Sequence, residues 1–207
     1  MIVIIPMKSA HVKSRLSSVL SEEQRTEFSR SLLSDILSVL RVSGLLRQCR
    51  VVSSDSKILD FAAEKGTVVV SEGSDAGVNE AVKNGLATIE GDEDILVLPS
   101  DLALLRAPEL GRLLRLKSSG LDVVMAPSTT FNGTNALLFS STLGFPLSYD
   151  NDSFWNHLVS CGRLGLSVGV CCERGLMFDV DTPQDLRLLS RSRAKRRSVV
   201  FAKGVLA

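Results

Sequence analysis

The feature that most constrains the fold is an alternation of short, continuously apolar segments with longer segments of helical periodicity. Apolar runs that do not alternate with polar residues are typical of strands covered by helices on both faces of a parallel sheet. The order of elements therefore predicts a three-layer α/β/α fold around a mostly parallel sheet. The predicted strands are 2–5, 50–53, 67–70, 95–98, 122–126, 136–139 and 167–171, and the predicted helices lie near 21–47, 56–65, 75–88, 107–119, 152–161 and 183–194.

Two helix starts are clearly marked. Ser21 and Gln24 have the spacing of a capping box, and Thr182-Pro183 followed by Asp185 predicts a second capped start. Asp185 is therefore expected to cap a helix. Without internal repeats or a low-complexity linker, the chain is predicted to form one domain over 1–207. Within it we expect a loop or β-hairpin insertion at about 128–150 and a basic tail at about 187–207.

Composition excludes several classes of protein. The net charge of +1 over 207 residues gives no overall attraction to nucleic acid or membrane, and we expect neither as a partner. The four cysteines include no C-x-x-C pair, which disfavours a zinc site or a disulfide framework. The apolar run after Met1 is too short for a membrane span and lacks the layout of a signal peptide. We therefore expect a cytoplasmic protein.

The C-terminal segment admits two interpretations. Its cluster of arginines and lysines between Arg187 and Arg197 is either an RNA-binding arm or the solvated end of the last helix. The second interpretation is favoured because no aromatic residues are interleaved with the charges. Beyond the cluster, the apolar residues 199–201 suggest packing on a neighbouring subunit, and on that ground a homodimer is hypothesised.

A cationic loop follows the first predicted strand. It contains Lys8, Lys13 and Arg15, which suit a polyanion such as a triphosphate, although a solvated basic loop has the same composition. The loop has neither the G-x-x-x-x-G-K-[ST] pattern of a P-loop nor the G-x-G-x-x-G pattern of a dinucleotide-binding domain. P-loop NTPases and dinucleotide-dependent oxidoreductases are thereby disfavoured.

Carboxylates follow the fourth predicted strand and occur again near the end of the chain. Asp101 comes directly after an apolar strand, where a carboxylate is well placed for Mg²⁺ or simply for a turn. Asp179 and Asp181 alternate on an extended segment, so we expect only one of them to face the same cleft.

Two further groups have the composition of an anion site. The segment 132–135 combines amides with the hydroxyl of Thr134 and would suit either an anionic substrate or a plain turn. Ser153 and His157 are one helical turn apart near a helix start, where backbone N–H groups favour anions. His157 has no partner at metal-ligand spacing, and we expect it, like His11, to be a core or surface imidazole. No nucleophile elbow or Ser/His/Asp order indicates a covalent hydrolase.

These segments recur together in one known family. Their order and spacing resemble those of the 2-phospho-L-lactate guanylyltransferases over roughly residues 1–190. Each motif is short, and the specificity lies in their joint order. The motifs are IPMK at 5–8, KSRL at 13–16, SEG at 71–73, GVNEA at 77–81, LPSD at 98–101, GTNALL at 133–138 and DVDTPQDL at 179–186.

The resemblance implies a GT-A-like nucleotidyltransferase fold and a step in coenzyme F420 biosynthesis. GTP and 2-phospho-L-lactate, or a related acid such as phosphoenolpyruvate, would react with Mg²⁺ present. The products would be lactyl-2-diphospho-5′-guanosine, for the lactate substrate, and pyrophosphate. By motif, the triphosphate would meet Lys8, Lys13 and Arg15, and the metal would be held by Asp101 with Asp179 or Asp181. The same carry-over assigns the acid to Thr134, Asn135 and Ser153, and the nucleoside to Glu72, Gly73 and Asn79.

One departure and two alternatives stay open at this point. Where the family usually has Phe-Gly before its serine, this chain has acidic residues at Asp150 and Asp152, which would repel an anionic substrate. A different nucleotidyltransferase, acting on a molybdenum cofactor or a sugar phosphate, is one alternative. A non-catalytic nucleotide-binding protein on the same fold is the other.

Overall fold

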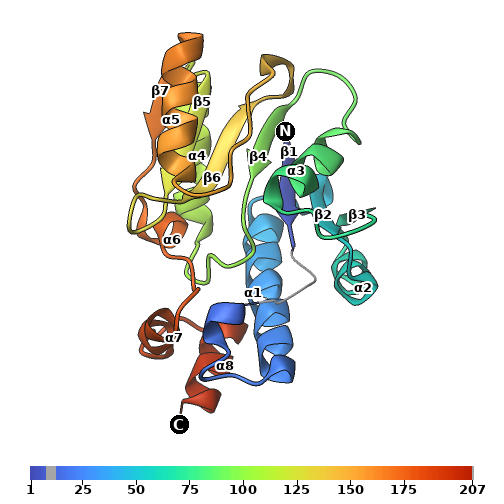
Figure 1. Ribbon diagram of the computed structural model, residues 1–207, viewed down its shortest axis with the longest axis vertical. Coiled ribbons are helices and arrows are strands. Elements are labelled where there is room, and N and C mark those ends of the chain that lie inside the picture. The colour runs from blue at the N-terminus through green and yellow to red at the C-terminus, as the bar shows by residue number, and fades with distance from the viewer. Residues whose placement is uncertain (8–12, 207) are drawn as a thin grey trace.

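A seven-stranded sheet forms the centre of the molecule (Figure 1). The computed structural model describes residues 1–7 and 13–206. Neighbouring strands are parallel except β6, which runs antiparallel to both β4 and β5. The mostly parallel sheet and all seven predicted strands are confirmed. In spatial order the strands are β3 (Val68–Ser71), β2 (Cys49–Ser53), β1 (Ile2–Pro6), β4 (Asp94–Val97), β6 (Thr134–Ser140), β5 (Val123–Pro127) and β7 (Val168–Val170).

Helices cover both faces of the sheet, which completes the three predicted layers. On β1, Val3 and Ile5 face one core cluster, whereas Ile4 faces the other. The first cluster is closed by α1 (Glu22–Val42), α2 (Ser56–Glu64) and α4 (Ala107–Ser118). The second is closed by α3 (Val78–Leu86) and α5 (Ser153–Leu164). The strands are continuously apolar because helices bury both of their faces.

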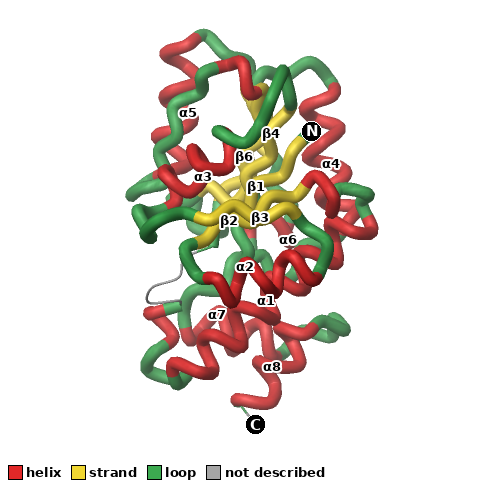
Figure 2. The backbone as a smooth tube through the Cα atoms, turned by 90° about the vertical axis from the view of Figure 1, so that its right-hand side faces the viewer, coloured by secondary structure: helices red, strands yellow, loops and turns green. Residues whose placement is uncertain are grey.

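The C-terminal third differs from the sequence prediction. The helix predicted for 183–194 ends at Ser190 as α7 (Pro183–Ser190), and two helices were not predicted, α6 (Arg174–Met177) and α8 (Arg197–Val205). The two predicted caps are present, since Ser21 forms a capping box with Gln24 and Thr182 forms one with Asp185. Figure 2 shows α7 and α8 beneath the sheet together with α1, where a third apolar cluster holds them.

The helix α8 packs on α1 of its own chain, whereas the basic residues Arg187, Arg191, Arg193 and Lys195 before it are exposed, as expected for a solvated segment. Val199 and Ala202 are fully buried or nearly so, and the ring of Phe201 stacks on Phe28 with 5.2 Å between centroids. Val200 is exposed. The hypothesis that residues 199–201 pack on a neighbouring subunit therefore loses its basis, because two of them are used within the chain.

The segment predicted as an insertion belongs partly to the sheet. Residues 128–133 form the turn between β5 and β6, and β6 itself lies between β4 and β5. Because β6 is antiparallel, its first residues lie at the edge where the other strands have their carboxyl ends. Thr134 and Asn135 are thereby brought to the same edge as the loop after β4. In the described part of the chain, no helix has the length and apolar character needed to cross a bilayer.

Asp35 on α1 anchors the start of α8 through one buried carboxylate. It accepts hydrogen bonds from the backbone N–H groups of Arg197 and Ser198 at 3.0 and 2.9 Å, and from the Ser198 hydroxyl at 2.6 Å. We predict that Asp35→Ala lowers the free energy of unfolding by about 3 kcal/mol, because it leaves three buried donors unpaired. Urea denaturation would measure this. Asp60→Ala, on the exposed side of α2, is the matched control and should change stability by less than about 0.5 kcal/mol.

Candidate active site

A single ammonium group joins three distant segments at the carboxyl edge of the sheet. The Lys13 side chain is 10% exposed, and its Nζ lies 2.8 Å from Asp101 Oδ2 and 2.8 Å from Asp181 Oδ1. The strand order turns back between β1 and β4, so the loops that follow them diverge and leave a crevice there. Lys13 and Asp101 come from those two loops. The sequence prediction that Asp101 lies beside the late acids is met by the geometry.

Asp179 lies close enough to this cluster for its charge to interact with those of Asp101 and Asp181. Its pKa is raised to about 6, first because burial disfavours the charged form and second because the Asp101 carboxylate lies close by. Asn135 donates from Nδ2 to Asp179 Oδ1 at 3.1 Å and to the carbonyl oxygen of Met177 at 3.0 Å. Asp181 contacts Lys13, whereas Asp179 is held by Asn135, so the expectation that only one of them faces the cleft stays a prediction. The backbone here is not a regular strand that alternates its side chains.

The segment before Asp179 is held tightly by α4. Glu109 on α4 is 2% exposed and accepts a hydrogen bond from the Gly175 backbone N–H at 3.3 Å. A Cβ atom at Gly175 would lie 2.7 Å from the carbonyl oxygen of Leu104, so the close approach requires glycine. At the start of α6, Glu173 forms an ion pair with Arg112. These contacts set the position from which the chain runs to Asp179.

The cluster suits a cation, although it is not a complete metal site by itself. Over residues 1–7 and 13–206, no group of three or more His, Cys, Asp or Glu side chains is arranged to hold a metal ion. Lys13 stands between Asp101 and Asp181, which explains why the three acids do not converge on one point. Asp101 Oδ1, however, is buried and has no hydrogen-bond partner in the described part of the molecule. Mg²⁺ binds carboxylate oxygens in proteins. The unpaired oxygen of Asp101, with the carboxylate of Asp179 nearby, has the chemistry of such ligands.

The predicted cations divide into three cases. Burial alone would lower the pKa of Lys13, but the attraction of Asp101 and Asp181 outweighs it and raises the pKa above its usual value. Lys13 is therefore a charged side chain that links Asp101 and Asp181 through two ion pairs. Arg15 is 73% exposed, with Nη1 3.5 Å from Asp181 Oδ2, and its guanidinium is accessible to an incoming anion. Lys8 and His11 lie outside the described residues.

The residues predicted to bind the phosphorylated acid lie together where β6 meets α5. The backbone N–H of Thr134 donates to Ser153 Oγ at 2.8 Å, and both residues are at least 94% buried. Thr134 Oγ1 is 2.9 Å from Nδ1 of the buried His157, whose Nε2 accepts a hydrogen bond from the Ser148 backbone N–H at 3.0 Å. The prediction that His157 is a core imidazole is confirmed by its complete burial. Of the segment 132–135, Asn132 and Gly133 belong to the turn before β6, whereas Thr134 and Asn135 begin the strand.

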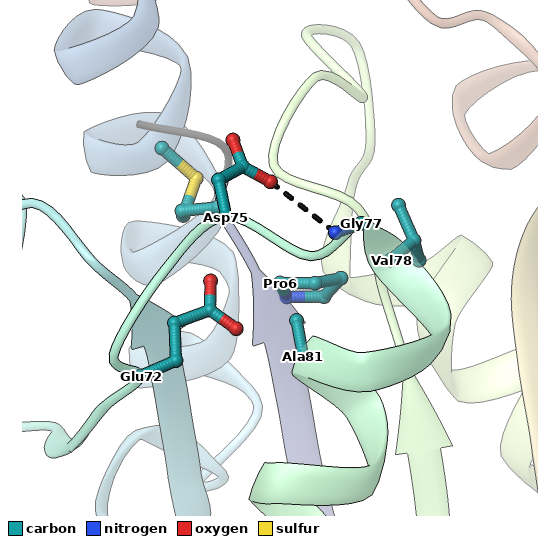
Figure 3. Close-up of a pocket in the computed structure, with 7 residues that line it drawn as sticks. Pro6, Glu72, Asp75, Gly77, Val78 and Ala81 are labelled. Atoms are coloured by element: carbon teal, nitrogen blue, oxygen red, sulfur yellow. Dashed lines mark hydrogen bonds between the residues drawn. The ribbon is translucent and has the colours of Figure 1, made fainter. Parts of the chain in front are cut away.

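A pocket between β1 and α3 contains one residue of the predicted nucleoside site. Figure 3 shows the carboxylates of Glu72 and Asp75 around it, with the ring of Pro6 between them and α3. Burial raises the pKa of Glu72. The Asp75 side chain accepts a hydrogen bond from the Gly77 backbone N–H at 3.4 Å, which shapes the loop before α3. The other lining residues are Met7, Gly77, Val78 and Ala81. Gly73 is exposed and is not part of this lining.

Asn79 connects α3 with the loop before α5. Its Oδ1 accepts the Tyr149 backbone N–H at 2.8 Å, and its Nδ2 donates to Asp150 Oδ2 at 3.3 Å. Both polar atoms of the side chain are used in this way, so in this arrangement Asn79 positions the loop. Asp150 is one of the two acidic residues that depart from the family pattern. Its carboxylate accepts this hydrogen bond from Asn79. Asp152 takes a left-handed backbone conformation just before Ser153, with φ of 56°.

Three participants, Asp75, Gly77 and His157, were not identified from the sequence as site residues. A fourth residue, Asn135, was identified, but its side chain has another partner in the structure. Asp75 and Gly77 line the pocket, and the D-A-G turn signal before α3 could have indicated them. Asn135 was predicted to bind substrate, whereas its side chain holds Asp179. His157 was expected to be structural only, because its two partners lie 23 residues and 9 residues away in the chain. A pattern of neighbouring residues in the sequence does not indicate hydrogen bonds between residues so far apart in the chain.

The fold and the site together define a class of protein. Carboxylates and cations converge at the switch point of a three-layer sheet, as a nucleotidyltransferase requires for a triphosphate and its counter-ion. The solved structure of a cytidylyltransferase from Leptospira borgpetersenii matches the chain with a TM-score of 0.63. The match covers 99% of this chain and 92% of that one at 14% identity, and it shows the same fold. The protein is a nucleotidyltransferase, because its sequence relatives are guanylyltransferases.

Sequence comparison gives the family. The model described as guanylyl transferase CofC like matches residues 1–198, and the chain belongs to that family. A phosphoenolpyruvate guanylyltransferase from Rubrobacter xylanophilus is 34% identical over 192 residues, covering 91% of this chain and 93% of the relative. A 2-phospho-L-lactate guanylyltransferase from Methanocaldococcus vulcanius is 33% identical over 187 residues, covering 90% and 82%. The family resemblance seen in the motifs is confirmed.

The buried imidazole generates a prediction about pH. Burial lowers the pKa of His157 to about 4, below the value of about 6.5 in an unfolded chain. Between these values the unfolded state binds more protons, so acid favours unfolding. We predict that the stability of the wild type relative to His157→Asn falls by about 2 kcal/mol from pH 7 to pH 5.

Urea denaturation of both proteins at the two pH values checks this prediction. Other titrating groups, including Asp179, are common to the two proteins and cancel in the difference to a first approximation. A stability difference that stays constant between pH 7 and pH 5 would show that His157 titrates normally in the folded protein.

Proposed function

We propose that the protein transfers GMP from GTP to a small phosphorylated three-carbon acid, 2-phospho-L-lactate or phosphoenolpyruvate, and releases pyrophosphate. The product with 2-phospho-L-lactate would be lactyl-2-diphospho-5′-guanosine, a step in coenzyme F420 biosynthesis. The observation that carries the proposal is the cluster of Asp101 and Asp181 around Lys13, with Asp179 close by, at the edge where Thr134 begins β6. The names of the two relatives support guanylyl transfer and leave open which acid is used.

The chemistry requires charge neutralisation and alignment more than a reactive side chain. An oxygen of the acid's phosphate attacks the α-phosphorus of GTP and forms the new P–O bond. The bond to the β-phosphate oxygen breaks, and pyrophosphate leaves with that electron pair. The attacking phosphate is already anionic near neutral pH and needs no covalent intermediate. The chain must therefore bring two anions together and hold them in line.

We assign the cationic side of the site to Arg15, Lys13 and Lys8. Arg15 is the accessible group and can grip two phosphate oxygens with its planar guanidinium. Lys13 keeps Asp101 and Asp181 apart and oriented at the bottom of the crevice. Lys8 is assigned from the family motif at 5–8 alone.

We assign Mg²⁺ to Asp101 and Asp179. The orphaned Oδ1 of Asp101 and the burial of Asp179 beside it support this choice, whereas Asp181 is engaged with Lys13 and Arg15. When bound, the ion would offset the negative charge that develops on the departing pyrophosphate. Asn135 fixes one oxygen of Asp179 through a hydrogen bond.

We place the nucleoside at the pocket of Glu72 and Asp75. Two carboxylates there suit the N1 and N2 protons of guanine, which are donors that adenine and the pyrimidines do not present in the same way. The acid is placed at Thr134 and Ser153. We further propose a cytoplasmic location, which the exposed free thiol of Cys172 supports because such thiols persist in a reducing compartment.

Mass spectrometry of the product tests the proposal directly. Purified protein is incubated with the four NTPs and Mg²⁺, together with 2-phospho-L-lactate, phosphoenolpyruvate, a sugar phosphate or no acceptor. We expect a guanylylated three-carbon acid and stoichiometric pyrophosphate. A cytidylylated or uridylylated product would assign the protein to another branch of the fold. NTP binding without any product would support a non-catalytic protein.

Asp101 is the residue whose removal should affect turnover most clearly. We predict that Asp101→Ala lowers kcat at least about a hundredfold at saturating Mg²⁺, because the variant lacks the unpaired carboxylate oxygen to which the ion is assigned. The fold should survive, since Asp101 lies in a loop at the sheet edge and the side chain is 21% exposed. Circular dichroism and steady-state pyrophosphate release measure the two effects, with Asp60→Ala as a control of normal activity. Near-normal turnover of Asp101→Ala would contradict the metal role.

A further inference from the structure

The hydrogen bonds of His157 determine which of its ring nitrogens carries the proton. A backbone N–H can only donate, and the Ser148 N–H points to Nε2 at 3.0 Å, so Nε2 must present its lone pair. In a neutral imidazole the proton is then on Nδ1. Nδ1 is 2.9 Å from Thr134 Oγ1, so His157 donates and the threonine oxygen accepts.

The same hydrogen bonds make the hydroxyl oxygens of Thr134 and Ser153 acceptors, so each hydroxyl keeps a proton to donate. Thr134 Oγ1 accepts from His157, and Ser153 Oγ accepts from the Thr134 backbone N–H. Neither hydroxyl has an acceptor for its own proton within the described part of the chain. Both side chains are nonetheless buried to at least 94%. Two adjacent buried donors without acceptors are matched by a ligand rich in anionic oxygens.

We propose that His157 is a positioning residue that makes the Thr134 hydroxyl an obligatory donor to the phosphorylated acid. The inference rests on the proposed function and extends it, because it explains how a hydroxyl that could either donate or accept is set to recognise an anion. A threonine free to rotate would spend part of its time with its lone pairs toward the anion and would repel it. His157 removes that orientation without touching the substrate.

The surroundings of His157 keep the ring neutral and fixed. The rings of Phe145 and Tyr149 lie 5.7 and 5.0 Å from it, and it is completely buried between α5 and the loop 144–151. Burial lowers its pKa, which agrees with a neutral ring. Protonation would also destroy the lone pair that receives the Ser148 N–H. The loop and the threonine are therefore oriented by one imidazole.

A pair of variants separates this role from simple packing. His157→Leu removes the donor and keeps an apolar side chain, whereas His157→Asn retains an amide N–H close to the position of Nδ1 and loses the bond from Ser148. We expect His157→Leu to raise KM for the acid about tenfold and to leave KM for GTP within about twofold. His157→Asn should recover most of the loss. Equal defects in both variants, or an equal rise in KM for GTP, would indicate a merely structural residue.

A double-mutant cycle with Thr134 tests the route of the effect. In the Thr134→Val protein there is no hydroxyl to orient, so adding His157→Leu should raise KM for the acid by less than twofold more. An additional tenfold rise in that background would overturn the proposal. Thermal unfolding of each variant shows whether the fold is retained.

Nitrogen-15 NMR of the imidazoles at pH 7 observes the tautomer without any substrate. The chain has two histidines, and His11→Gln leaves the signal of His157 alone. We expect a neutral ring with the proton on Nδ1; a proton on Nε2, or on both nitrogens, would overturn the proposal. The two possible failures are distinguishable. Absence of product with every acid rejects the proposed function, whereas product formation by a protein with the wrong tautomer rejects only the role of His157.

Discussion

The ion pairs of Lys13 are the interaction on which the arrangement of the site depends. They connect a loop near the start of the chain, the loop after β4, and a segment 168 residues further along than Lys13 itself. Without that ammonium, the carboxylates of Asp101 and Asp181 would lie near each other with no cation between them. Like charges about 4 Å apart repel by roughly 4 kcal/mol at an effective dielectric constant of about 20. The positive charge of Lys13 replaces this repulsion with two attractions.

Much of the fold could be predicted because its cause is local. Each strand is a short apolar run, and each run is bounded by turn or capping residues that the sequence shows directly, as at Ser21 and Thr182. The site edge could also be predicted, since side chains after parallel strands meet at one edge whatever the details of packing. That rule is sufficient to bring Asp101 near the loop of Lys13. The late acids were added by motif order, and the geometry agrees.

What could not be predicted depends on partners far away in the chain. The antiparallel direction of β6 leaves no mark on its apolar residues, which read like those of a parallel strand. Helix α8 begins within a run of basic residues, and its apolar side becomes visible only against Phe28 of α1. The segment that carries Asp179 and Asp181 is positioned by the bond of Gly175 to Glu109 and by the bond of Asn135 to Asp179, whose partners lie far away in the chain.

The start of β6 explains how two chemically different subsites keep a fixed separation. Neighbouring residues of a strand point to opposite faces, so Thr134 turns toward α5 while Asn135 turns toward the segment after α6. On one face Thr134 meets Ser153 and His157; on the other, Asn135 holds Asp179. The acid and the proposed metal would thus be gripped by consecutive residues of one central strand, which is paired on both sides and cannot shift easily. A shift of β6 by one residue would exchange the two faces, so the register of this strand sets the position of the phosphate relative to the carboxylates.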